Sequence, residues 1–293
     1  PLEDAILSAV RGGKYIMGPE VAQLEEDLAA FCGAKYVIAC SNGTDALHMA
    51  LRAKDVGPDH AVFVPSFTFA ATAETVVLAG AVPVFVDVDP QTFNMDNRSL
   101  EAAIEYAREE GLNPAGVITV DLFGQPADYN FIEAVCEAHD LWLMDDAAQG
   151  FGASYKGRKI GTIGDVTATS FFPAKPLGCY GDGGAVFTDD EVLAAKMKSI
   201  RVHGKGTHKY DNARIGLNAR LDTVQAAVLI HKLRIFGEEI EKRQDVADRY
   251  DAALSDIAVT PKLMENCTST WAQYTLNLTH HDRDEIAGQL KEV

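Results

Sequence analysis

The sequence has 293 residues, 47% hydrophobic and 24% charged, with a formal net charge of −17. This length allows one large domain or two smaller ones. The acidic charge argues against a nucleic-acid partner, because binding a phosphate backbone requires a basic face. No run approaches the roughly 18 apolar residues of a membrane helix, and the N-terminus lacks the basic and apolar regions of a signal peptide.

The first 200 residues alternate short apolar runs with helical patterns, which is typical of βα units and a largely parallel sheet. The strands are predicted at 36–39, 61–64, 82–86, 116–120, 141–145, 166–170 and 185–187. The helices between them are predicted at 74–79, 100–110 and 131–139. We therefore expect an α/β fold with a mainly parallel central sheet between helices.

After residue 188 the pattern becomes mostly helical. Helices are predicted at 189–200, 221–254 and 282–292, and a strand at 271–278. We expect a large α/β domain over 1–235, then a connecting helix and the start of a smaller C-terminal α+β domain over 236–293. Because the sequence begins without Met and ends within a helical pattern, this smaller domain is expected to be incomplete.

The cysteines are five in number, scattered, and without a CxxC pair. This arrangement indicates reduced thiols in a cytoplasmic protein, not a disulfide framework or a zinc site. No bound metal is expected.

A small polar turn, Ser41 to Asp45, separates the strand at 36–39 from a helix that ends near Lys54. A helix N-terminus offers free N–H groups and a positive dipole end, so the N–H groups of Thr44 and Asp45 are candidates for binding a phosphate. Capping of the helix by Ser41 or Asn42 explains the same residues without a ligand. The turn alone does not decide between the two.

Asp145 and Asp146 lie where the apolar strand at 141–145 ends. In open α/β sheets, ligands bind outside the carboxyl ends of the strands. An acid in that place can bind a metal ion, a ribose or a protonated ring nitrogen, or it can simply face water.

Lys175 follows an apolar segment and precedes Pro176 and Gly178. Most lysines are solvated surface charges. A lysine in a confined apolar place loses its proton more easily and becomes a nucleophile toward aldehydes. The segment is therefore a candidate Schiff-base lysine, with a surface charge as the alternative.

The order of these features matches the needs of pyridoxal 5′-phosphate (PLP). Its phosphate requires a helix N-terminus such as the one near Thr44, and its ring requires a flat face such as Phe69. Its pyridine nitrogen requires a carboxylate such as Asp146, and its aldehyde requires an amine such as Lys175.

The sequence resembles the DegT/DnrJ/EryC1/StrS family of PLP-dependent sugar aminotransferases over nearly its whole length. The matching motifs are Gly43–Leu47, Asp146–Gln149, Ser170–Lys175 and Asn218–Asp222. Segments 171–184 and 209–212 are similar to the members that aminate UDP-2-acetamido-2-deoxy-3-oxo-glucuronate. The resemblance implies the fold-type I, aspartate aminotransferase-like architecture.

The resemblance also implies roles for the residues that would surround the cofactor ring. Lys175 and Asp146 are the expected catalytic residues, the first bound to the cofactor and the second paired with its pyridine nitrogen. Gln149 is expected to reach the ring hydroxyl, and Phe69 to stack on the ring.

The phosphate site implied by the resemblance is shared between two subunits. Asn218 of the partner subunit is expected to complete it, which would make a homodimer obligatory for activity. Arg220 is expected to meet the acidic sugar, and Tyr180 to line the substrate pocket. The phosphate contacts expected from the same chain as Lys175 are Thr44, Asp45 and Ser170.

The implied reaction is a ping-pong transfer of an amino group from glutamate to a nucleotide-linked keto sugar. The expected acceptor is UDP-3-oxo-N-acetylglucosaminuronate, and the expected pathway is surface polysaccharide biosynthesis, as for lipopolysaccharide O-antigen. A PLP-dependent lyase or dehydratase, or a non-catalytic sensor that keeps the fold, is the alternative. Related sugar 3-dehydratases carry His in place of the lysine, so Lys175 disfavours that branch.

Overall fold

The computed structural model describes residues 1–208, 210–278 and 282–292. Lys209, in the similar segment 209–212, and Val293, at the end of the chain, lie outside the described residues. No helix in the described ranges is long and apolar enough to cross a membrane.

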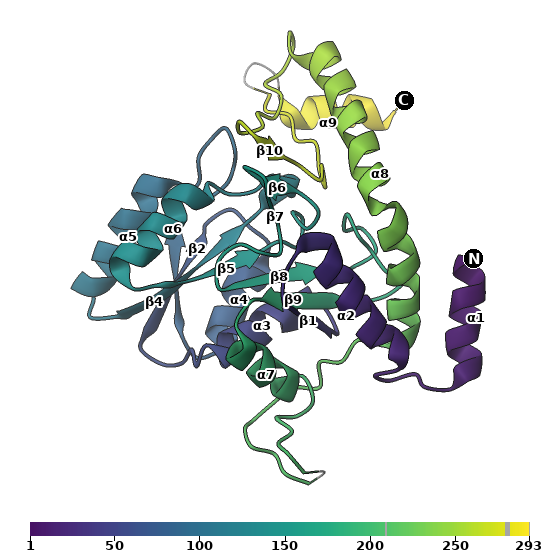
Figure 1. Ribbon diagram of the computed structural model, residues 1–293. Coiled ribbons are helices and arrows are strands. Elements are labelled where there is room, and N and C mark those ends of the chain that lie inside the picture. The colour runs from purple at the N-terminus through teal and green to yellow at the C-terminus, as the bar shows by residue number, and fades with distance from the viewer. Residues whose placement is uncertain (209, 279–281, 293) are drawn as a thin grey trace.

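A seven-stranded sheet forms the centre of the molecule (Figure 1). Its strands are β1 (Tyr36–Cys40), β2 (His60–Pro65), β3 (Val82–Val86), β4 (Asn113–Val120), β5 (Trp142–Asp146), β8 (Val166–Ser170) and β9 (Gly184–Thr188). They lie in the order β1-β9-β8-β5-β4-β2-β3. Every neighbouring pair from β8 to β3 is parallel, and β9 runs antiparallel to both of its neighbours. The predicted α/β class with a mainly parallel sheet is confirmed.

Helices cover both faces of this sheet. One face carries α2 (Pro19–Cys32), α5 (Asn97–Glu109), α6 (Tyr129–His139) and α8 (Thr223–Leu254), and the other carries α3 (Gly43–Ala53), α4 (Ala70–Leu78) and α7 (Glu191–Ile200). Successive strand residues point to opposite faces, so each strand contributes to both cores. Leu143 of β5 packs in the first core, and Met144 packs in the second.

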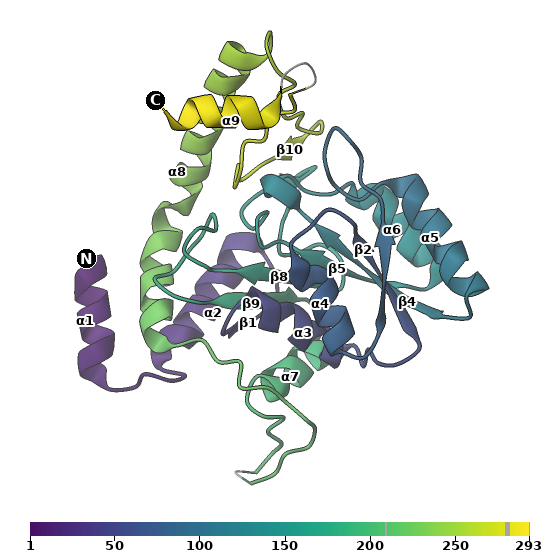
Figure 2. The same cartoon turned by 180° about the vertical axis from the view of Figure 1, so that it is seen from behind.

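The helix α8 is 32 residues long and runs along the side of the molecule, beside α1 (Leu2–Gly12) (Figures 1 and 2). It continues through the boundary predicted at residue 235. Beyond it, β10 (Cys267–Thr268) pairs with β6 (Ser154–Tyr155), which also pairs with β7 (Arg158–Lys159). The helix α9 (Arg283–Lys291) follows.

The strand predicted at 271–278 is wrong. The segment is irregular, and its one bridge within the described residues joins Asn277 to Val259. Trp271 has a left-handed φ of 48°, and Gln273 donates its backbone N–H to the carbonyl of Phe123 at 3.3 Å. The aromatic side chains of this segment lie against α8: the Tyr274 ring is 5.2 Å from that of Tyr250, and Nε1 of Trp271 donates to Gln244 at 2.8 Å. The helices α1 and α2 were not predicted.

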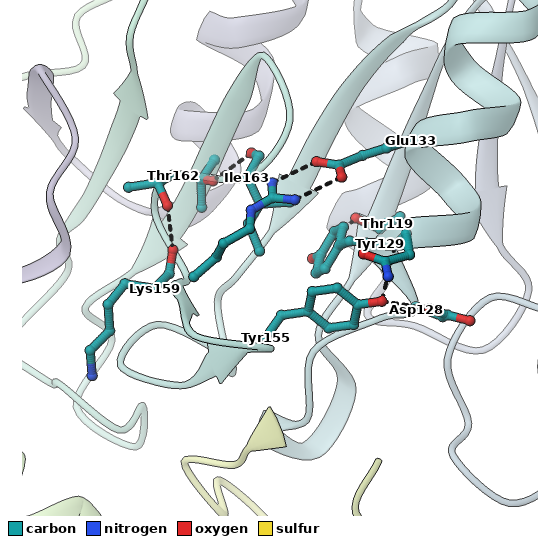
Figure 3. Close-up of polar contacts among 11 residues, drawn as sticks. Thr119, Asp128, Tyr129, Glu133, Tyr155, Lys159, Thr162 and Ile163 are labelled. Atoms are coloured by element: carbon teal, nitrogen blue, oxygen red, sulfur yellow. Dashed lines mark hydrogen bonds and ion pairs between the residues drawn. The ribbon is translucent and has the colours of Figure 1, made fainter. Parts of the chain in front are cut away.

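The hairpin of β6 and β7 is fixed to α6 by polar contacts (Figure 3). The guanidinium of Arg158 donates two hydrogen bonds to the carboxylate of Glu133, at 2.7 and 2.6 Å. The hydroxyl of Tyr155 donates to Asp128 at 2.7 Å. These contacts anchor the chain between β5 and β8, the two strands whose ends carry Asp146 and Ser170.

Candidate active site

The predicted site residues gather at one edge of the sheet. Cys40 ends β1, Asp146 ends β5 and Ser170 ends β8. Both β1 and β8 run antiparallel to β9, and β5 is parallel to β8, so all three strands run in the same direction. The residues that follow them therefore meet at the carboxyl edge, where α/β sheets bind ligands.

The turn after β1 forms the N-terminus of α3. Asn42 is the N-cap, and its Oδ1 accepts the N–H of Asp45 at 2.7 Å. The Asp45 carboxylate in turn accepts hydrogen bonds from Ser41 and Asn42. The capping interpretation therefore holds for Asn42, and the cap occupies the N–H of Asp45 that was predicted to bind a phosphate. The N–H groups of Gly43 and Thr44 open the first turn, where no acceptor exists within the helix, and they point along its positive end.

Gly43 brings this helix N-terminus against Ser170. A Cβ on Gly43 would lie 2.7 Å from the Cβ of Ser170, closer than real Cβ atoms approach, so the contact requires glycine. The Ser170 hydroxyl accepts the N–H of Phe172 at 3.2 Å. The helix N–H groups and this hydroxyl thus form a cradle suited to a phosphate.

Asp146 is 6% exposed, and two donors hold its carboxylate. The Thr72 hydroxyl donates to Oδ2 at 2.9 Å, and the N–H of Ala148 donates to Oδ1 at 3.2 Å. Burial raises the pKa of Asp146, and these two hydrogen bonds and the charge of Lys175 oppose the rise. A protonated ring nitrogen would find here an acid that is already ordered.

Lys175 lies on the loop between β8 and β9, half-buried. Burial lowers the pKa of its amine, and attraction to Asp146 opposes the change. A lowered pKa increases the fraction of neutral amine, which is the form that attacks an aldehyde. Partial burial and a lowered pKa are the properties expected of a Schiff-base lysine.

The loop that carries Lys175 is held at its base and from α8. Phe171 donates its N–H to the carbonyl of Gly183 at 2.7 Å, which closes the loop. The N–H of Tyr180 donates to Oε1 of Gln225, on α8, at 2.9 Å. The Tyr180 side chain, predicted to line the substrate pocket, is exposed.

Phe69 and Gln149 lie on the two segments that adjoin Asp146, the start of α4 and the turn after β5. Phe69 is the N-cap residue of α4 and is 74% exposed, one turn before Thr72. Gln149 is on the turn that follows Asp146, and its Oε1 accepts the N–H of Phe123 at 2.6 Å. Both predicted ring contacts are therefore at the same sheet edge as the acid.

Asn218 and Arg220 lie on the segment that leads into α8. The backbone of Arg220 forms an antiparallel bridge with Cys40, and Ser41 donates its N–H to the carbonyl of Ala219 at 3.2 Å. The Arg220 guanidinium donates to Oδ1 of Asn218 at 2.5 Å. Asn218 is exposed, so the pair lies at the surface beside the turn that begins α3.

Sequence reasoning missed a buried acid cluster on the opposite face of the sheet. Asp145 alternates with Asp146 along β5 and points toward Asp121 and Tyr129. The Tyr129 hydroxyl donates to Oδ1 of Asp121 at 2.7 Å (Tyr129 is drawn in Figure 3). Neither carboxylate oxygen of Asp145 has a hydrogen bond of acceptable geometry within the described residues.

Burial dominates the electrostatics of this cluster. Burial, with repulsion from Asp121, raises the pKa of Asp145 well above its ordinary value, although the nearby hydroxyls of Tyr129 and Thr167 oppose the rise. Burial also raises the pKa of Asp121 to about 7, against the hydrogen bonds from Tyr129 and Ala127. Two adjacent acids at a strand end were the available signal, because one of them must face the interior.

Thr72 was also missed, although it contacts Asp146 directly. Its only sequence signal is its spacing of one helical turn from Phe69.

Comparison with known proteins identifies relatives over nearly the whole chain. The model of the DegT/DnrJ/EryC1/StrS aminotransferase family matches residues 2–293. A UDP-2-acetamido-2-deoxy-3-oxo-D-glucuronate aminotransferase from Pseudomonas aeruginosa is 48% identical over 291 residues, which cover 99% of this chain and 79% of that protein.

Two solved structures extend the comparison. A DegT DnrJ EryC1 StrS aminotransferase from Brucella abortus has a TM-score of 0.97 and 53% identity, covering 99% of this chain and 78% of the other. NtdA from Bacillus subtilis, solved with its bound cofactor PMP, has a TM-score of 0.89 and 30% identity, covering 99% and 67%.

Proposed function

Because the chain belongs to the DegT/DnrJ/EryC1/StrS aminotransferase family, we propose that it is a PLP-dependent enzyme that transfers an amino group from glutamate to a nucleotide-linked keto sugar. The observation that carries the proposal is that the half-buried amine of Lys175 and the buried acid Asp146, whose charges influence each other, both lie at the carboxyl edge. The bound PMP of NtdA, the pyridoxamine form of PLP, supports the choice of cofactor.

PLP, when bound, supplies an aldehyde and a ring that takes up electrons from the reacting carbon. Lys175 would bind the aldehyde, and Asp146 would keep a proton on the pyridine nitrogen. Gln149 would donate to the ring hydroxyl, and Phe69 would cover the ring face. Asp146 suits its task because Thr72 and Ala148 already stabilise the ionised carboxylate. The phosphate contacts would come from the N–H of Thr44 and the hydroxyl of Ser170, because the N–H of Asp45 is already bound by Asn42.

Lys175 would also act as the acid and base of the reaction. Once the amino donor has displaced it, its neutral amine can accept the proton from the donor's α-carbon and return it at C4′ of the cofactor. The lowered pKa of this amine favours that exchange near neutral pH. The return half of the reaction runs the same proton transfer toward the sugar.

The acceptor that we propose is UDP-2-acetamido-2-deoxy-3-oxo-D-glucuronate, for the synthesis of a surface polysaccharide. Its support is the 48% identity, over 99% of this chain, to a protein named for that substrate. Arg220 provides a guanidinium beside the phosphate cradle and would bind the sugar carboxylate, which pairs well with a planar two-pronged cation. Tyr180 would line the same pocket.

We further propose a homodimer in the cytoplasm, with Asn218 of the partner subunit completing the phosphate site. The exposure of the corresponding side chain in this chain supports a shared site. The segment between α7 and α8 also projects from the body of the molecule (Figure 1), where it would contact a second subunit. The five free thiols suit a reducing compartment.

The test is the absorbance of the PLP-loaded protein before and after L-glutamate is added. The band of bound PLP should fall, that of the pyridoxamine form should rise, and one 2-oxoglutarate should form per cofactor. The UDP keto sugar should then restore the first band. Lys175→Ala should slow the glutamate step by about 10²–10⁴-fold or more, while Lys35→Ala, an exposed lysine, should leave it unchanged.

Two results would contradict the proposal. Breakdown of the sugar nucleotide without formation of 2-oxoglutarate would favour a lyase or dehydratase. A protein that folds but takes up no PLP would favour the sensor or regulator.

A further inference from the structure

Gln149 is held at two points by residues outside the turn that carries it. Its side-chain Oε1 accepts the N–H of Phe123 at 2.6 Å. Its main-chain carbonyl accepts the hydroxyl of Thr270 at 2.5 Å. Thr270 lies 121 residues further along the chain and is fully buried.

The first contact fixes which end of the Gln149 amide is free. A backbone N–H can only donate, so the side-chain atom that meets it must be the carbonyl oxygen. The other end, the NH2 group, is then the end of the amide that can donate to a ligand. A hydrogen-bond donor is the group required beside the phenolic oxygen of PLP, which accepts.

The turn that carries Phe123, η1 (Leu122–Gly124), is also bound to the segment around Thr270. The N–H of Thr270 donates to the carbonyl of Gly124 at 3.1 Å. Gly124 has a φ of 106°, and a Cβ there would lie 2.3 Å from Oγ1 of Thr270. Only glycine therefore allows this turn and Thr270 to approach so closely.

Phe123 itself is in the left-handed region, with φ 61° and ψ 1°. Such a conformation is unfavourable for a bulky residue and persists only where its surroundings enforce it. Its ring packs edge-on against Phe67 at 6.1 Å and Phe93 at 5.7 Å, between ring centroids. This packing holds the N–H of Phe123 toward Gln149.

We propose that Thr270 is a positioning residue for the cofactor ring, acting together with the N–H of Phe123 to hold the Gln149 amide with its NH2 group toward the phenolic oxygen. The inference rests on the proposed function, because it requires PLP at this site. It assigns to the segment after α8 a part in tuning the cofactor, although Thr270 touches no cofactor atom itself.

The test is the pH midpoint of the visible band of the PLP-loaded protein. A hydrogen-bond donor to the phenolic oxygen stabilises the negative charge of that oxygen. It therefore lowers the pKa of the proton shared between this oxygen and the nitrogen that links PLP to Lys175. Thr270→Val removes the hydroxyl at nearly constant size and should raise the midpoint by about 0.5–1 pH unit. Thr270→Ser, which keeps the hydroxyl, should restore the wild-type midpoint.

The matched control is Thr268→Val. Thr268 lies two residues away on β10, where its hydroxyl contacts Ser154 at 2.8 and 2.9 Å, so its replacement should not move the midpoint. If Thr270→Val does not fold, Thr270→Cys, with a weak S–H donor, should give a smaller shift in the same direction.

A double-mutant cycle separates this inference from the proposed function. In a Gln149→Ala background, which should itself raise the midpoint, Thr270→Val should add no further shift. Failure of the wild type to bind PLP would overturn the proposed function. A shift with Gln149→Ala but an unchanged midpoint with folded Thr270→Val would overturn the positioning role alone, as would an additive shift in the double variant.

Discussion

Burial acts on Lys175 and Asp146 with opposite effects on their pKa values. It lowers the pKa of the amine and raises that of the carboxyl, because desolvation disfavours the charged form of each. Their mutual attraction opposes both shifts. The Thr72 hydroxyl and the Ala148 N–H stabilise only the carboxylate. These residues therefore favour a reactive amine beside an acid that can stay ionised.

Asp145 shows what burial does without such donors. A folded pKa above the unfolded value means that the protonated form stabilises the fold. That contribution is complete below the unfolded pKa of about 4, and it is lost as the pH rises through the folded pKa. Asp145→Asn, neutral at every pH, should therefore gain stability relative to wild type by up to about 1.4 kcal/mol per pH unit as the pH rises from the unfolded pKa toward the folded pKa.

Urea unfolding across that pH range measures the difference. The control is Asp140→Asn, at an exposed aspartate in a left-handed position that Asn tolerates well, and its effect should not change with pH in this way. A difference between Asp145→Asn and wild type that shrinks as the pH rises would show that Asp145 is ionised in the folded protein.

Among the elements, the turn from β1 into α3 depends most on a single residue. A Cβ on Gly43 would lie 2.7 Å from that of Ser170, so Gly43→Ala must move the helix N-terminus away from the hydroxyl. We expect the Kd for PLP to rise by about tenfold or more, since such overpacking costs about 1–3 kcal/mol.

The measurement is an absorbance titration of the apoprotein with PLP. The control is Gly12→Ala, because a Cβ at Gly12 meets no atom within 4 Å. Equal affinities for Gly43→Ala and wild type would mean that the cradle between α3 and Ser170 does not hold the phosphate.

The strands were predictable because they are short apolar runs between turn residues, and β2, β3 and β8 lie within a residue or two of their expected bounds. The same criterion failed at 271–278. There Trp271 and Tyr274 contact α8, and a single sequence does not reveal whether a strand has a partner. The helices α1 and α2 were not predicted, although Val21, Leu24 and Leu28 form the buried stripe of α2.

The site also contains residues that the sequence could indicate and residues that it could not. Asp146 was a candidate because it lies at a strand end, and Lys175 because of the apolar segment before it, whereas Ser170 was expected only from the family resemblance. Thr72, Phe123 and Thr270 were not expected, since each acts through a contact that depends on the packing of separate elements.

At the scale of the whole molecule, the sheet edge and the segment after α8 form one continuous structure. Met264 donates its N–H to Oε1 of Gln125 at 2.7 Å, and Thr270 and Gln273 bind the turn at Phe123. On the opposite side, Gln225 of α8 holds the loop that carries Lys175. The long helix and the segment after it therefore support both sides of the proposed cofactor site.

The most direct test of the central claim is to load the protein with PLP, reduce it with borohydride and map the labelled peptide. Reduction makes the link between PLP and an amine permanent, so the modified lysine can be read from the fragment masses. We predict one cofactor per chain, on Lys175, with no label on this peptide in Lys175→Ala. A label on a different lysine, or spread at low level over the exposed lysines, would contradict the assignment of Lys175 and the site built around it.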